Sequence, residues 1–168
     1  EDLNSSFYTI EQPYTLMYTT ASQASYIIEE APKVDFSGNE KLRNAYIGEA
    51  HFWRAFAHYY LLTNFRQVSP IRQMPRGAED YVRKPESPEA VWDFIKEDLE
   101  RAKELLPEKG YWTGDNTGRV SKAAAAALQG ICYMYRTGIE KHYGSSTQTY
   151  YEEAAKEFDQ IIKGDFGS

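Results

Sequence analysis

Five residues in one short segment have side-chain types suited to binding a sugar. In KGYWTGDNTGR, Tyr111 and Trp112 fall between glycines and off any helical stripe. An exposed ring stacks on the apolar C–H face of a sugar, and Asp115, Asn116 and Arg119 are near enough to exchange hydrogen bonds with its hydroxyls. The alternative is that Trp112 folds back onto the helical scaffold and serves packing. We predict a ligand-binding site at these five residues from this segment alone.

A second group of residues suggests metal or acid–base chemistry, but its spacing does not support it. His51 and His58 are seven residues apart in a predicted helix, hence about 10 Å, which is too far to bind one zinc ion directly. We expect both histidines and Arg54 to line the polar edge of their helix. The acidic cluster at 97–100, which includes Asp98, has lysines interspersed, so we expect a solvated helix face.

Motifs for catalysis and cofactor binding are absent from the sequence. It contains no G-x-S-x-G elbow, no phosphate-binding glycine loop, no H-E-x-x-H and no C-x-x-C. The one cysteine, Cys132, excludes an internal disulfide, and its apolar surroundings LQGICYMY predict a buried, unreactive thiol. We predict no catalytic residue, no metal and no cofactor, although two carboxylates brought together by folding remain an open alternative.

The composition predicts one domain that does not bind nucleic acid. A chain of 168 residues with 42% hydrophobic and 26% charged residues can bury one core. The net charge of -6 and the scattered basic residues argue against phosphate binding. No apolar run approaches 18 residues, and the residues from Glu1 to Asn4 lack the features of a signal peptide, so we expect no export signal in this chain.

These candidate residues lie on or between predicted helices. Apolar residues recur at spacings of three and four, and capping residues mark several ends. The predicted helices run from Ile10 to Ile28, with Pro13 in the first turn, from Ala45 to Leu62, from Ser87–Pro88 to Leu106, from Ser121 to near Gly138, and from Tyr150 to Gly164. Residues 66–86 are predicted to form an extended surface loop, and residues 107–119 and 137–149 to form turns.

Two of the helices carry the signature of a tetratricopeptide repeat. Trp53, Phe56, Ala57 and Tyr60 follow the order W-x2-apolar-small-x2-Y, in which the small residue admits the paired helix. A weaker copy is Ala126, Gln129, Gly130 and Tyr133, and matching second helices are Ile95, Leu99, Ala102 and Pro107, and Ala154, Phe158, Ile161 and Phe166. We therefore predict an all-α fold of tetratricopeptide-like helical hairpins with long irregular loops, and we expect the rings of the second helix to be mostly core.

Four segments, in this order, resemble the helical amino-terminal part of the SusD/RagB family. They are YIGEAHFWRAFAHYYLLTNF, SPEAVWDFIKEDLERAKELLP, GRVSKAAAAALQGICYMYRTG and YYEEAAKEFDQIIKGDF. Together they cover nearly the whole chain.

Two features depart from the family pattern. The chain is about a third of a typical member's length, and RQVSPI replaces a glycine-acid-valine-proline string after the aromatic helix. We therefore expect residues 1–168 to be one helical domain and a fragment of a longer SusD-like protein.

The resemblance implies a nutrient-capture protein and not an enzyme. Members are lipoproteins on the outer face of the outer membrane in Bacteroidetes, where they cap a SusC-like TonB-dependent transporter and capture glycans, or sometimes peptides. The implied partners here are that transporter and an oligosaccharide or peptide, with membrane attachment only through an amino-terminal lipid outside this chain. Two alternatives remain open: a tetratricopeptide scaffold that binds a protein or peptide, and a helical hydrolase or lyase acting on sugars, which needs paired carboxylates.

Overall fold

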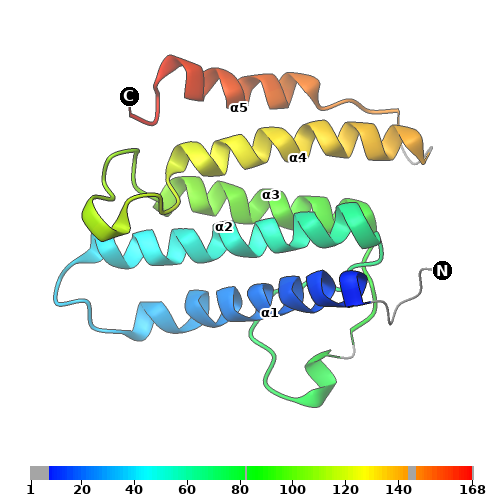
Figure 1. The fold of residues 1–168 in the computed structure, drawn as a ribbon, viewed down its shortest axis with the longest axis horizontal. Coiled ribbons are helices and arrows are strands. Elements are labelled where there is room, and N and C mark those ends of the chain that lie inside the picture. The colour runs from blue at the N-terminus through cyan, green and yellow to red at the C-terminus, as the bar shows by residue number, and fades with distance from the viewer. Residues whose placement is uncertain (1–7, 82, 144–146, 168) are drawn as a thin grey trace.

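The protein is a layered set of helices joined by irregular segments. The computed structural model describes residues 8–81, 83–143 and 147–167, so the predicted turn at 144–146 and residues 1–4 lie outside the described residues. The elements are α1 (Tyr8–Glu30), η1 (Ala31–Lys33), α2 (Glu40–Phe65), η2 (Ala78–Tyr81), α3 (Pro88–Leu105), η3 (Gly114–Asn116), α4 (Lys122–His142) and α5 (Tyr151–Lys163). Figure 1 shows the long helices side by side, with α1 at one edge and α5 at the other. The described residues contain no strand, and the all-α prediction is confirmed.

The capping residues set several helix ends as the sequence predicts. The Ser87 side chain accepts a hydrogen bond from the backbone nitrogen of Ala90 at 3.2 Å, and Pro88 occupies the first turn of α3. Gly164 ends α5 in the left-handed conformation with φ of 78°, which a residue with a side chain rarely adopts. Within the described residues, no helix combines the length and apolar character that crossing a bilayer requires.

Several predicted helix boundaries are wrong. The helix predicted from Ala45 to Leu62 runs from Glu40 to Phe65. α1 begins at Tyr8, so Pro13 lies inside the helix and not in its first turn. α4 continues past Gly138 to His142, because an ion pair between Arg136 and Glu140, 2.8 Å apart, spans the glycine on one helix face. The segment from residue 137 to 142, predicted as a turn, is therefore helical.

Small residues allow the helices to approach closely. A Cβ atom at Gly130 would lie 2.6 Å from the ring of Phe158, so the absence of a side chain there lets α5 pack on α4. A Cβ atom at Gly48 would lie 2.9 Å from the backbone nitrogen of Leu106, at the end of α3. Ala57 is fully buried in a cluster with Ala21 of α1, so the neighbour that it admits is α1. The α2–α3 and α4–α5 pairs form the two predicted hairpins, and α1 packs on α2.

The aromatic rings of α2 lie at the edge of the core. Phe52, Phe56 and Tyr59 are half-buried against it, whereas Trp53 is 45% exposed and contacts the edges of Phe52 and Phe56. The expectation that these rings are mostly core is therefore wrong for Trp53. The prediction for Cys132 is confirmed, because its side chain is buried in the core and burial raises the pKa of its thiol.

Charged groups replace the rings on the inner face of α2. Arg54 is 6% exposed, and its Nε and Nη2 atoms donate to the two carboxylate oxygens of Asp98 in α3 at 2.8 and 2.7 Å. His51 Nδ1 donates to the same carboxylate at 2.7 Å. Burial alone would raise the pKa of Asp98, but the hydrogen bonds from Arg54 and His51 outweigh it, and this pKa is lowered. The predictions that His51 and Arg54 line a polar edge and that Asp98 is solvated are wrong, because these groups satisfy one another inside the hairpin.

His58 is also buried, contrary to the prediction, and it anchors the loop after α2. Its Nδ1–H donates to the carbonyl of Arg54 at 2.7 Å, and its Nε2 accepts from the backbone N–H of Ile71 at 3.0 Å. Burial lowers the pKa of His58 to about 4, so the ring is neutral, as this pattern of one donor and one acceptor requires. The predicted loop at 66–86 is irregular apart from η2, and Ile71 is buried beneath α1 and α2.

Candidate ligand-binding site

The segment that joins α3 to α4 folds into a closed loop beside the amino-terminal end of α2 (Figure 1). The backbone N–H of Lys122 donates to the carbonyl of Pro107 at 2.9 Å, which brings the two ends of the loop together. Gly110 and Gly118 have φ of 91° and 93°, and these left-handed turns fold the chain back on itself. The five residues predicted to bind a ligand therefore sit on a compact loop.

Trp112 lies on the scaffold and does not extend into solvent. Its Nε1–H donates to the carbonyl of Val120 at 2.9 Å, and its ring is half-buried. The ring centroid lies 4.9 Å from that of Tyr111 and 6.5 Å from that of Tyr46 on α2. The structure thus adopts the packing alternative for Trp112, with the ring still partly open to solvent.

Arg119 connects the loop to α2. Its Nε donates to Glu49 Oε1 at 3.0 Å, a second bond joins its Nη2 to Glu49 Oε2, and the hydrogen bonds from Glu49 raise the pKa of Arg119. The guanidinium carbon lies 4.3 Å from the centroid of Trp112 and 4.6 Å from that of Tyr46. We name Tyr46, Glu49, Tyr111, Trp112 and Arg119 the loop cluster.

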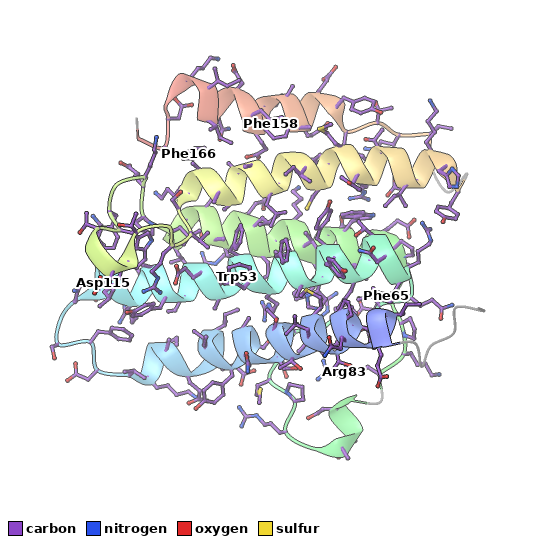
Figure 2. All side chains as sticks on the ribbon, in the orientation of Figure 1. Trp53, Phe65, Arg83, Asp115, Phe158 and Phe166 are labelled. Carbon is purple, nitrogen blue, oxygen red and sulfur yellow. The ribbon has the colours of Figure 1, made fainter. Side chains whose placement is uncertain are left out.

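The structure brings some of the predicted site residues together and separates one. Asn116 Oδ1 accepts from Arg119 Nη1 at 3.3 Å, and the ring of Tyr111 lies 4.6 Å from the ammonium group of Lys41. Asp115 stands at the outer end of the loop (Figure 2), and its carboxylate has no hydrogen-bond partner among the described residues. Four of the five side chains therefore belong to one neighbourhood, and Asp115 lies at its margin.

Two hollows border the loop cluster. The Tyr111 hollow, of about 550 Å³, lies between the start of α2 and the end of α3 and is lined by Lys41, Asn44, Tyr111 and Lys122 among others. The Trp53 hollow, of about 390 Å³, lies between α1 and α2. Its lining includes Gln23, Tyr46, Glu49, Trp53 and Arg119. Both volumes fall near or within the range of roughly 300–1,000 Å³ that is typical of small-molecule sites.

Sequence reasoning missed the contribution of α2 to this site. Tyr46, Glu49 and Trp53 are spaced three and four residues apart, so they share one helix face with Ala50 between them. That spacing was available from the sequence, but Trp53 was assigned to the core and Tyr46 and Glu49 were given no role. Rings, an amide and a guanidinium–carboxylate pair together present both apolar surface and hydrogen-bonding groups. Among the described residues, no group of three or more histidine, cysteine, aspartate or glutamate side chains could hold a metal ion.

Comparisons with known proteins match this fold. Residues 1–134 match the SusD-like family that is described as starch-binding and associating with the outer membrane. The SusD-like protein P2 of Formosa agariphila is 29% identical over 150 residues, which make up 89% of this chain and 28% of that protein. A SusD homolog from Bacteroides thetaiotaomicron superposes with a TM-score of 0.80 at 21% identity, over 99% of this chain and 31% of its own. Surface glycan-binding protein A from Bacteroides fluxus superposes with a TM-score of 0.70 at 25% identity, over 90% of this chain and 29% of its own.

The relatives that this chain matches are longer than the chain. It spans less than a third of the length of each of these three relatives. The family match itself covers most of this chain, from residue 1 through most of α4. The resemblance carried by the four helical segments is therefore confirmed, and the chain belongs to the SusD-like family.

Proposed function

We propose that this protein is a non-catalytic subunit that captures glycans at the cell surface. In this proposal it is held on the outer face of the outer membrane by an amino-terminal lipid that lies outside this chain. It delivers an oligosaccharide to a SusC-like TonB-dependent transporter. The family description and the glycan-binding relative from Bacteroides fluxus support this class of ligand.

The observation that carries the proposal is the Trp53 hollow beside the loop cluster. Trp53 presents a 45% exposed ring, and Tyr46 a half-buried one, to the same space. Arg119 and Glu49 line one end of this space and hold each other, so both groups are fixed in place before a ligand arrives. Apolar rings flanked by fixed polar groups suit a sugar, which has C–H faces and hydroxyls on one molecule.

Of the five residues predicted from the sequence, Arg119 lines the Trp53 hollow and three others lie around it. Tyr111, Trp112, Asn116 and Arg119 form or border the loop cluster, and Asp115 is exposed at the loop's outer end, where a longer glycan could contact it. Trp112 contributes mainly by holding the side chain of Arg119 in position, because the guanidinium packs on the face of its ring. Trp53 and Tyr46 supply the platform.

A glycan-binding titration with matched variants tests the proposal. Intrinsic tryptophan fluorescence is followed as neutral oligosaccharides are added to the wild type, Trp53→Ala, Trp112→Ala and Tyr151→Ala. Tyr151 is an exposed ring at the start of α5, far along the chain from the loop cluster, so its removal controls for loss of an aromatic surface. We expect affinity to fall roughly five- to tenfold in Trp53→Ala, the value of one ring contact. It should also fall in Trp112→Ala, because Arg119 loses the ring that it packs on, and stay unchanged in Tyr151→Ala. Equal affinity in all four proteins would refute the assignment of the site.

A further inference from the structure

A separate pocket lies on the other side of α1, against the loop that follows α2. Its volume is about 480 Å³, within the range of roughly 300–1,000 Å³ typical of ligand pockets. α1 supplies Tyr14, Thr15, Tyr18, Thr19 and Gln23 to its lining. The opposite wall comes from the loop, including Arg83, which Figure 2 shows beside α1. We name this cavity the α1 pocket.

The loop wall of the α1 pocket is fixed to the scaffold. The backbone N–H of Ser69 donates to the hydroxyl of Tyr18 at 3.1 Å, and the carbonyl of Ile71 accepts from the Ser25 hydroxyl at 3.0 Å. The backbone N–H of Met74 donates to the carboxylate of Glu29 at 2.8 Å. These bonds join an irregular segment to α1 at three points, so the pocket is formed before any ligand arrives.

The α1 wall carries rings and hydroxyls side by side. The centroids of Tyr14 and Tyr18 lie 4.8 Å apart, and the Tyr14 residue is 39% exposed. Thr15 and Thr19 are exposed one helical turn apart, so they face the same side. In the part of the chain that the structure describes, neither threonine hydroxyl nor the Gln23 amide has a hydrogen-bond partner. Hydroxyls and amides both donate and accept, which matches the hydroxyls of a sugar.

Charge favours a neutral ligand. Asp80 and Arg83, the two charged residues in the described lining, face each other with Arg83 Nη2 3.8 Å from Asp80 Oδ1. Arg83 Nε donates to the carbonyl of Asp80 at 2.7 Å, and Asp80 Oδ2 accepts from the backbone N–H of Arg76 at 2.9 Å. The pair leaves no net charge in the pocket to attract an acidic sugar or a cation.

The backbone of the loop argues against an extended peptide. A peptide that adds to a loop or strand needs unpaired N–H and carbonyl groups. Here the N–H groups of Ser69, Ile71 and Met74 are already bonded to Tyr18, His58 and Glu29. Because these three N–H groups are not available to a peptide, the unpaired side-chain hydroxyls and amide on α1 favour a carbohydrate.

We propose that the α1 pocket is a second carbohydrate subsite that binds a neutral oligosaccharide. Tyr14 and Tyr18 stack on a sugar ring, and Thr15, Thr19 and Gln23 bond to its hydroxyls. Gln23 also lines the Trp53 hollow, so one glycan chain crosses α1 from one subsite to the other. This inference takes the class of ligand, a glycan, from the proposed function. The place where the ligand binds is argued from the α1 pocket alone.

Amide NMR spectra of the full chain, titrated with neutral oligosaccharides, test the subsite. The probes are maltohexaose, cellohexaose, laminarihexaose and mannohexaose. We expect shifts at the amides of Ser69 and Met74, and we expect the Thr15→Val, Thr19→Val double variant to lose those shifts and to bind at least about tenfold more weakly. Thr63→Val, the same exchange on α2 outside the pocket, should bind as the wild type does. Circular dichroism of each variant establishes that it is folded.

The outcomes separate the two sites. If the double variant binds with unchanged affinity while Trp53→Ala binds roughly five- to tenfold more weakly, the proposed function stands and the second subsite is refuted. If the double variant loses the Ser69 and Met74 shifts while Trp53→Ala keeps them and binds with wild-type affinity, the α1 pocket is supported and the Trp53 site is refuted. If an acidic oligogalacturonate or a mixture of tripeptides shifts these amides and the neutral sugars do not, the assignment to neutral carbohydrate is wrong. Absence of binding by every sugar refutes both sites.

Discussion

Lowering the pH from 7 to about 4 should destabilise this protein through one buried histidine. His58 has no exposed surface, donates from Nδ1 to the carbonyl of Arg54 and accepts at Nε2 from the N–H of Ile71. A proton added to Nε2 would face the Ile71 N–H, so the ring would have to break this bond or remain neutral. Burial is the main cause that lowers its pKa from 6.5 to about 4.

The size and sign of the effect follow from these two pKa values. Because the pKa is lower in the folded state, the unfolded state binds the proton first as the pH falls. The contribution of His58 to stability is therefore complete above about pH 6.5 and is lost progressively as the pH falls toward about 4. The difference between 6.5 and about 4 corresponds to roughly 3 kcal/mol of unfolding free energy. Asp98 adds a separate loss only at lower pH, because its pKa lies below 3.8.

Urea unfolding followed by far-ultraviolet circular dichroism measures the contribution of His58 to the free energy of unfolding. The free energy of unfolding is determined at several pH values for the wild type and for His58→Gln, which has no group that titrates at this position. We expect the wild type to lose roughly 3 kcal/mol more than the variant across this pH range. The two proteins differ only at residue 58, so the contributions of all other residues cancel in the difference. Parallel curves for the two proteins would refute the reasoning.

Two further predictions concern packing and the buried ion pair. Asp98→Ala leaves the guanidinium of Arg54 buried without its carboxylate and should lower the free energy of unfolding in urea by about 3–5 kcal/mol. The combined Arg54→Met, Asp98→Leu variant buries no charge and should recover most of that loss. A double variant as unstable as the single one would contradict this account. Gly130→Ala should lower the melting temperature, at a cost of about 1–2 kcal/mol, because the new Cβ atom would lie 2.6 Å from the ring of Phe158. Gly138→Ala in the same helix meets nothing within 4 Å and should stabilise by roughly 0.5–1 kcal/mol, so equal effects at the two glycines would count against the packing explanation.

The sequence predicts the fold well because local signals mark most of it. Ser87 and Pro88 start α3, and Gly164 ends α5, since capping and left-handed turns depend on neighbouring residues alone. The end of α4 was missed because Gly138 is an effective helix stop only when nothing spans it, and the Arg136–Glu140 pair does. That pair was visible in the sequence, but its strength relative to the glycine was not.

The candidate site was harder to predict because α2 is apolar around most of its circumference. Periodicity cannot say which face of such a helix is inside. The rings were assigned inward and the charges outward, whereas Trp53 faces solvent and Arg54 faces Asp98. The inward orientation of Arg54 depends on an acid 44 residues away, and no local pattern contains that partner. The loop residues from 111 to 119 were predicted as a ligand site because Tyr111 and Trp112 fall between glycines and off any helical stripe, and this assignment stays a prediction.

The guanidinium of Arg54 bonds to three parts of the chain at once. It donates to Asp98 of α3, to the Ser25 hydroxyl of α1 and to the carbonyl of Arg72 in the loop after α2. Opening that loop therefore takes one acceptor away from the buried guanidinium while its pair with Asp98 remains, and separating α1 from α2 takes away the Ser25 hydroxyl. Each opening leaves a buried donor without an acceptor, so local opening of this long surface loop costs more free energy than that of an untethered loop, and a protease should meet it in a cleavable form less often.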